Sequence, residues 1–259
     1  PIAAIFEQPT VAALTETVQA ALDGVAEETT APAIRAADEI EVSSTQQRLW
    51  FLNQLDPKSA QYHVPVAFRL AGSLQVETLC NALQQLTERH DALRSRFESR
   101  DGRPVQIIEP SAAVSLPVVD LVSIAETTRQ AELTRLIWEE ATRPFDLSAG
   151  PLLRVSLLQL AADDYVLLLT AHHIIADGWS MELLLRELGL SYTARASGRG
   201  VALDPLAIRY GVYLEQQHRA LRGPVIESQL AFWRKQLADL PLLDLPTDCV
   251  GRRKESDRG

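Results

Sequence analysis

The sequence predicts a mixed α/β fold of the α+β kind, in which helices pack on a largely antiparallel mixed sheet. Turn signals join neighbouring strand-like runs into hairpins, and segments with apolar residues at helical spacing separate those hairpins. A length of 259 residues is compatible with one large domain or two smaller ones.

The first forty residues predict a short helix followed by a linker. After Thr10, a residue typical of helix N-caps, apolar residues recur three and four positions apart as far as residue 22. Residues 23–41 contain Gly24, Pro32 and an excess of acidic residues without a sustained period. This composition is typical of a linker.

From residue 42 the pattern predicts a compact domain, taken here in chain order. A capped helix ends near Asp56, and Asp101-Gly102 predicts the turn of a hairpin. Asp163-Asp164 joins a second strand pair, and the last eleven residues, 249–259, are charged and predict a disordered tail. The other expected elements are a strand at 64–70, a helix from 76 to about 90, hairpin strands at 95–98 and 105–109, a helix at 124–142, strands at 152–160 and 165–170, and helices at 179–195, 210–218 and 228–237.

Composition excludes several classes of function. The net charge of −9 argues against a general binder of nucleic acid or of an anionic membrane, and no uninterrupted apolar run is long enough to span a bilayer. Cys80 and Cys249 lie far apart and give neither a metal spacing nor a disulfide framework, which favours a reducing, cytoplasmic setting. A start at Pro1 without a signal peptide predicts a piece of a longer polypeptide.

His172 and His173 follow a buried strand and precede a helix. Because side chains alternate along an extended segment, one imidazole is expected to point into a cleft and the other to the opposite side. A general base, a metal site and packed imidazoles hydrogen-bonded to the backbone all remain open. The metal site is the least favoured, since the other histidines, His63, His90 and His218, are scattered along the chain. A general base is chemically apt because an ordinary imidazole titrates near ~6.5.

The residues after the histidine pair have the chemistry of a turn and a helix start. Asp177 is expected to fix the loop through an arginine, and Gly178 to supply a positive φ or a close approach of another backbone. The candidate arginines are Arg89, Arg94 and Arg154. Trp50 and Trp179 are both predicted to lie in the core.

Other catalytic chemistries lack their sequence motifs. There is no G-x-S-x-G nucleophile elbow, no phosphate-binding Walker loop and no G-x-G-x-x-G after a predicted strand. A histidine that assists the attack of one bound substrate on another therefore remains.

Several segments together resemble one family. The run HHIIADGWS, residues 172–180, resembles the HHxxxDG motif of condensation domains in nonribosomal peptide synthetases. Residues 43–52, SSTQQRLWFL, are similar to the family's SxAQxRLWFL opening, and residues 89–97, RHDALRSRF, are similar to RHExLRTxF. Residues 145–154 and 230–248 also look like family segments in the right order. The resemblance spans 42–248 and is closest to the subtype that accepts an L-configured donor.

The resemblance implies a chloramphenicol-acetyltransferase-like fold of two lobes that meet at the histidine motif. Such a domain joins a donor thioester to the amine of an acceptor aminoacyl thioester, both carried on phosphopantetheine arms, and binds no cofactor or metal directly. The implied partners are upstream and downstream peptidyl carrier domains, an adenylation domain and a C-terminal lobe. No nucleic acid or membrane is implied.

The resemblance also assigns roles to individual residues. His173 would be catalytic, deprotonating or orienting the attacking amine, and His172 would support it. Gly178 would lie beside the reacting centre. Asp177, with Arg89 or Arg94, would hold the architecture of the site together with Trp179.

The domain organisation that follows has four parts. Residues 1–22 resemble the final helix of a carrier domain, 23–41 are a linker, 42–248 are the N-terminal, donor-side lobe of a condensation domain, and 249–259 are the tail. The second lobe is expected to be missing. The isolated chain is therefore expected to be inactive, or to serve as a catalytically idle module that docks carrier domains.

Overall fold

A computed structural model describes residues 10, 12, 15, 16, 19, 39–200 and 203–240. The chain divides into two compact units, residues 1–215 and 216–259, which are described separately. The expected tail with Cys249, most of the expected linker and all but isolated residues of the first helix lie outside the described residues.

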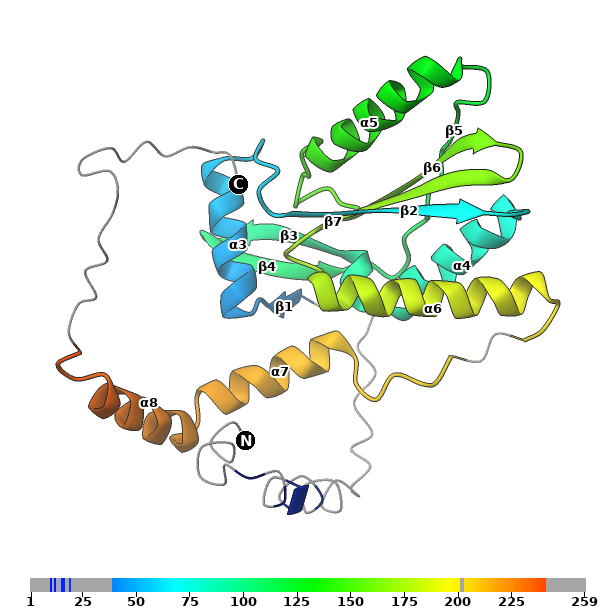
Figure 1. Ribbon diagram of the computed structural model, residues 1–259. Helices are drawn as coiled ribbons and strands as arrows, with labels where there is room; N and C mark the ends of the chain where they lie inside the picture. The colour runs from blue at the N-terminus through cyan, green and yellow to red at the C-terminus, as the bar shows by residue number, and fades with distance from the viewer. Residues whose placement is uncertain are drawn as a thin grey trace. The chain divides into compact units, whose positions relative to one another are not determined.

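The described elements follow the expected order closely (Figure 1). Two short strands were not expected. Glu39–Glu41, at the end of the predicted linker, forms β1, and Val118–Asp120 forms β5. The others are α3 (Ser44–Leu55), β2 (His63–Ala71), α4 (Val76–Arg89), a 3₁₀ turn (Asp91–Arg94), β3 (Ser95–Arg100), β4 (Arg103–Ile108), α5 (Glu126–Thr142), β6 (Leu153–Ala161), β7 (Asp164–His172), α6 (Gly178–Ala196), α7 (Tyr210–Leu221) and α8 (Pro224–Gln236).

Local chemistry explains the start of α3 and the hairpin of β3 and β4. Ser43 caps α3 through a capping box: its Oγ accepts from the Gln46 backbone nitrogen at 3.1 Å, and Gln46 Oε1 accepts from the Ser43 nitrogen at 3.0 Å. The turn between β3 and β4 consists of Asp101 and Gly102, with φ values of 49° and 77°. Positive φ at both positions is the geometry that suits a two-residue hairpin turn.

The strands form two sheets rather than one. A three-stranded antiparallel sheet has the order β1-β4-β3, and a four-stranded sheet has the order β2-β7-β6-β5. In the second sheet β5 runs parallel to β6 and the other pairs are antiparallel. The predicted largely antiparallel character is confirmed, but its division was not foreseen.

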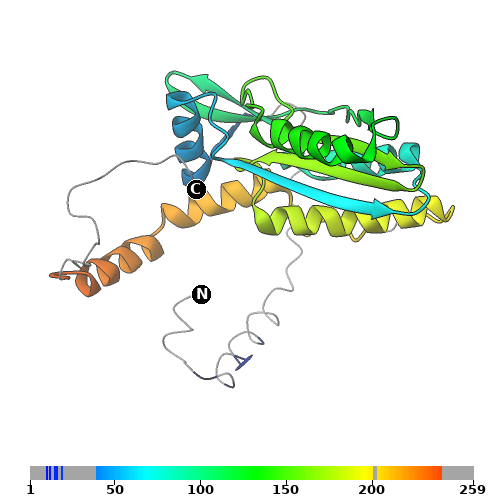
Figure 2. The same ribbon diagram turned by 45° about the horizontal axis from the view of Figure 1, so that its top comes forward.

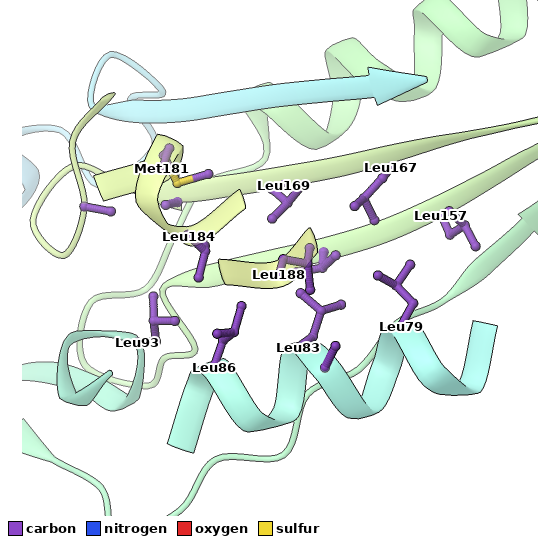
Figure 3. Close-up of a cluster of buried hydrophobic side chains, with 14 of the residues drawn as sticks. Leu79, Leu83, Leu86, Leu93, Leu157, Leu167, Leu169, Met181, Leu184 and Leu188 are labelled. Atoms are coloured by element: carbon purple, nitrogen blue, oxygen red, sulfur yellow. The ribbon is translucent and has the colours of Figure 1, made fainter. Parts of the chain in front are cut away.

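Strand β7 is covered on both faces, with α5 on one side of the sheet and α4 and α6 on the other (Figures 1 and 2). Odd-numbered residues of β6 and β7, such as Leu157, Leu167 and Leu169, pack against α4 and α6 (Figure 3). Even-numbered ones, such as Leu158 and Leu168, pack beneath α5. The alternation of side chains along a strand therefore assigns each residue near the end of β7 to a definite face.

The tryptophans are more exposed than a place in the core would require. Trp138 of α5 is 70% exposed, whereas Leu133 of the same helix is buried. Trp179 is 80% exposed, so its assignment to the core was wrong. Trp50 is half-buried and packs against the cluster that contains Phe145 and Ile174. Within the described residues, the helices are too short or too polar to cross a membrane.

Candidate active site

The two histidines occupy different environments at the end of β7. His172 is the last residue of the strand and is 2% exposed, whereas His173 follows it and is exposed. The backbone nitrogen of His172 donates to the Leu152 carbonyl at 2.9 Å, and that of His173 donates to the Tyr62 carbonyl at 2.8 Å. The predicted alternation of the imidazoles is confirmed, and the backbone of the pair is held from both neighbouring chain segments.

His172 is a neutral imidazole that shapes the backbone. Its Nδ1 accepts from the Ile174 backbone nitrogen at 3.1 Å. Burial, with further contributions from His63 and His173, lowers the pKa of His172 to about 4. Because the Nδ1 lone pair is engaged, the proton of the neutral ring lies on Nε2. His172 therefore fixes the turn in which His173 stands.

The rings of His63 and Phe145 pack against the ring of His172, and the sequence did not predict the position of His63. His63, expected to be remote, faces His172 across the β2–β7 register, with 6.1 Å between ring centroids. Phe145 lies edge-on to both, 5.0 Å from His63 and 6.0 Å from His172. Arg154 covers the Phe145 ring at 3.7 Å from its centroid. Only strand pairing brings His63 here, and no local pattern around it signals that pairing.

Asp177 caps α6 instead of pairing with an arginine. Its Oδ1 accepts from the Ser180 nitrogen at 2.8 Å and from the Ser180 hydroxyl at 2.6 Å. These bonds lower the pKa of the Asp177 carboxyl. The expected arginine partner was wrong: among the described residues Arg89 pairs with Glu187, Arg94 with Asp91 and Arg154 with Glu140.

Glu187 of α6 gathers two residues from the end of α4. Its Oε2 lies 3.2 Å from Arg89 Nε and 2.7 Å from His90 Nε2, and Glu187 is buried. Arg89 also donates to the Asp204 carbonyl at 2.6 Å. Arg89 therefore ties α4 to α6, the helix that Asp177 caps.

Arg94 holds the segment after α4. Its guanidinium pairs with Asp91 at 2.7 Å and donates to the backbone carbonyls of Thr87 and Glu109. Like Arg89, Arg94 has a structural place beside the site rather than a contact with Asp177.

Gly178 and Trp179 open the first turn of α6 to the surroundings. Gly178 lacks the positive φ expected from the sequence, and a Cβ built on it meets no atom within 4 Å in the described chain. Trp179 lines a cavity of about 200 Å³ together with His90 and Tyr210. Burial raises the pKa of the Tyr210 hydroxyl to about 12, so it stays protonated. Open space therefore lies at the first turn of α6, beside Trp179 and Ser180.

Comparison with known sequences identifies the family. Residues 36–258 match the Condensation domain family model. The chain is 42% identical over 262 residues to a linear gramicidin synthase of Brevibacillus parabrevis and 41% identical over 262 residues to malpinin synthetase of Mortierella alpina. Both alignments include the whole of this chain but only 3% of the length of either relative. The family match starts within the expected linker and continues into the expected tail.

Solved structures agree. The starter condensation domain of rhizomide synthetase superposes with a TM-score of 0.73 at 25% identity, covering 79% of this chain and 49% of that one. The X-domain from teicoplanin biosynthesis, in its complex with OxyB, gives a TM-score of 0.71 at 31% identity, covering 84% of this chain and 48% of that one. The expected chloramphenicol-acetyltransferase-like fold is confirmed, and the chain belongs to the condensation-domain family of nonribosomal peptide synthetases.

Proposed function

We propose that this chain is the donor-side half of a condensation domain. It forms a peptide bond between an acyl thioester on an upstream carrier domain and the amine of an aminoacyl thioester on a downstream one. The substrates arrive on phosphopantetheine arms, an adenylation domain loads them, and the donor terminus has the L configuration. The second lobe completes the site, so these residues alone have negligible activity.

The observation that carries the proposal is the contrast between the two imidazoles. His172 is buried, neutral and bonded through Nδ1 to Ile174, so it is not free to accept a substrate proton. His173 is exposed and stands five residues before Gly178, which opens α6. Only His173 of the pair can therefore reach a substrate.

The chemistry requires one proton acceptor and close approach of the substrates. The acceptor nitrogen attacks the donor carbonyl carbon, the carbon–nitrogen bond forms, and the carbon–sulfur bond breaks to release the donor arm's thiolate. His173 takes or steers the amine proton, which finally resides on the thiol. Holding the two tethered groups together supplies most of the acceleration, and the base adds to it.

The experiment uses the full polypeptide that contains these residues, with both carrier domains loaded. Intact-mass measurement of the downstream carrier follows the appearance of the condensed thioester. His173→Ala should lower this rate by at least about a hundredfold, while His218→Ala on α7 should leave it unchanged. An unchanged rate in His173→Ala removes His173 from the catalytic role.

A second function has one observation in its favour: the similar X-domain was solved in a complex with another protein, OxyB. By analogy, this chain would be a catalytically idle module that docks a carrier domain. The two functions separate in the same assay, supplemented by calorimetric titration with a carrier domain. Docking without product from the unsubstituted polypeptide supports the module, and product formation supports the enzyme.

A further inference from the structure

The ring of His63 stands at a junction of three elements near the histidine motif. His63 opens β2 and is the register partner of His172 at the end of β7. The rings of His63, His172 and Phe145 are mutually edge-on, with centroid distances of 5.0 to 6.1 Å. His63 therefore forms part of the wall against which the buried imidazole of His172 packs.

A side-chain hydrogen bond anchors this wall. His63 Nδ1 donates to the Ala141 carbonyl at 2.7 Å. Ala141 lies in the last turn of α5, where helix carbonyls lack partners within the helix. Arg154 binds the neighbouring carbonyls of Glu140 and Arg143 at 3.0 and 2.7 Å. The end of α5 is thus bound from β2 and β6 together, which makes it a rigid support for His63.

The two facing histidines have opposite tautomers. His63 carries its proton on Nδ1, because that atom donates to Ala141, and its buried Nε2 has no partner among the described residues. A proton on Nε2 would be a buried donor without an acceptor, which is costly. Burial is accordingly the largest cause of the lowered pKa of His63. His172 has the reverse arrangement, with Nδ1 accepting from Ile174.

Both members of the histidine pair depend on two consecutive residues. The Tyr62 carbonyl accepts the backbone N–H of His173 at 2.8 Å, and the next side chain, His63, packs against His172. Displacement of this short segment therefore disturbs the backbone of His173 directly and its supporting turn through His172.

We propose that His63 is a positioning residue for His173: its bond to the Ala141 carbonyl fixes the wall that holds His172, and His172 fixes the turn that carries His173. The inference rests on the proposed role of His173. It adds a residue outside the motif, which acts on His173 through His172 and the turn that His172 fixes.

The first test uses the unsubstituted chain. Labelling with ¹⁵N-histidine gives signals from the five histidines, and single substitutions assign them. At pH 7.5 we expect His63 as the Nδ1–H tautomer and His172 as the Nε2–H tautomer. The reverse tautomer at either ring overturns the proposal, whatever the variants do.

The second test compares two substitutions. His63→Leu fills similar space without an N–H donor, whereas His63→Asn places an amide donor where Nδ1 stood. In His63→Leu we expect mixed tautomers of His172, a shifted Ile174 amide signal and a condensation rate about tenfold lower in the full polypeptide. In His63→Asn we expect all three readouts to return most of the way to their original values.

Arg69→Ala is the matched control, because it removes an exposed ion pair with Asp164 at the far end of the same two strands. It should change none of the three readouts. Equal impairment of His63→Leu and His63→Asn, or a lost rate with an unchanged His172 tautomer, overturns the proposal. If His173→Ala leaves condensation unchanged, the proposed function fails, but the tautomers and the Ile174 amide still decide whether His63 positions His172.

Discussion

The Asp177 carboxylate accepts both the backbone N–H and the hydroxyl of Ser180, so among the described residues a local cap rather than an ion pair starts the helix after the histidine motif. Loss of such a cap costs about 1 kcal/mol. Asp177→Ala should therefore lower the free energy of unfolding by about that amount, and Asp177→Asn, which can also cap, by less than half of it. Urea denaturation of the chain measures both.

A loss of about 3 kcal/mol or more in Asp177→Ala would instead indicate a buried charge pair, whose disruption costs about 3–5 kcal/mol. The exposed position of Asp177 is the reason to expect the smaller value.

The buried imidazole of His172 predicts an acid-side loss of stability. Its pKa in the folded chain is about 4, below the ordinary value of 6.5, so the unfolded chain binds this proton first as the pH falls. The stabilisation is complete above pH 6.5 and is lost progressively toward pH 4, by about 3 kcal/mol in total.

His172→Asn is the matched variant, because the amide oxygen can accept from Ile174 without titrating. The difference between the two stability curves isolates His172 from the other titrating groups, because both proteins share those groups. The curves should diverge between pH 6.5 and 4. Parallel curves across that range would show that His172 is not a buried neutral imidazole.

Gly178 allows a test that separates folding from function. A methyl group there meets no atom of the described residues within 4 Å, and the backbone does not need a positive φ. Gly178→Ala should leave the free energy of unfolding within about 0.5 kcal/mol of its original value. If substrate passes this turn, the same variant should lower the condensation rate severalfold in the full polypeptide.

Thermal unfolding and the carrier-mass assay together check this prediction. A destabilisation above about 1 kcal/mol would place the constraint in the fold itself. Equal rates for glycine and alanine would argue against close approach of substrate.

Glu187 should contribute substantially to the free energy of unfolding, although it does not belong to the histidine motif. Glu187→Ala leaves Arg89 and His90 largely buried without their shared carboxylate, so we expect a loss of about 2–3 kcal/mol. Glu182→Ala on the exposed face of the same helix is the control and should cost less than about 0.5 kcal/mol. Similar losses for both variants would show that Glu187 contributes only helix propensity.

Features set by neighbouring residues could be predicted from the sequence. The Asp101-Gly102 turn, the cap of the helix that ends near Asp56 and the opposite placement of His172 and His173 each depend on a few consecutive residues, and each appears in the structure. Motif spacing likewise led to the condensation-domain family.

Features that depend on pairing between strands far apart in the sequence could not be predicted. His63 reaches His172 only through the β2–β7 register, and Glu39–Glu41 becomes a strand only because β4 offers an edge. The prediction of an arginine partner for Asp177 was wrong for a related reason. Charge suggested an arginine, but Ser180 lay closer along the chain, and the expected arginines had nearer acceptors of their own.

The length of strand β7 in its hairpin with β6 decides which face of the sheet each histidine of the motif takes. Since both faces of β7 are covered, an insertion or deletion of one residue between Asp164 and His172 would turn every following side chain to the opposite face. The two imidazoles would then exchange environments, with the reactive ring in the core and the supporting ring outside. Changes of strand length in this hairpin should therefore be compatible with function only in steps of two residues.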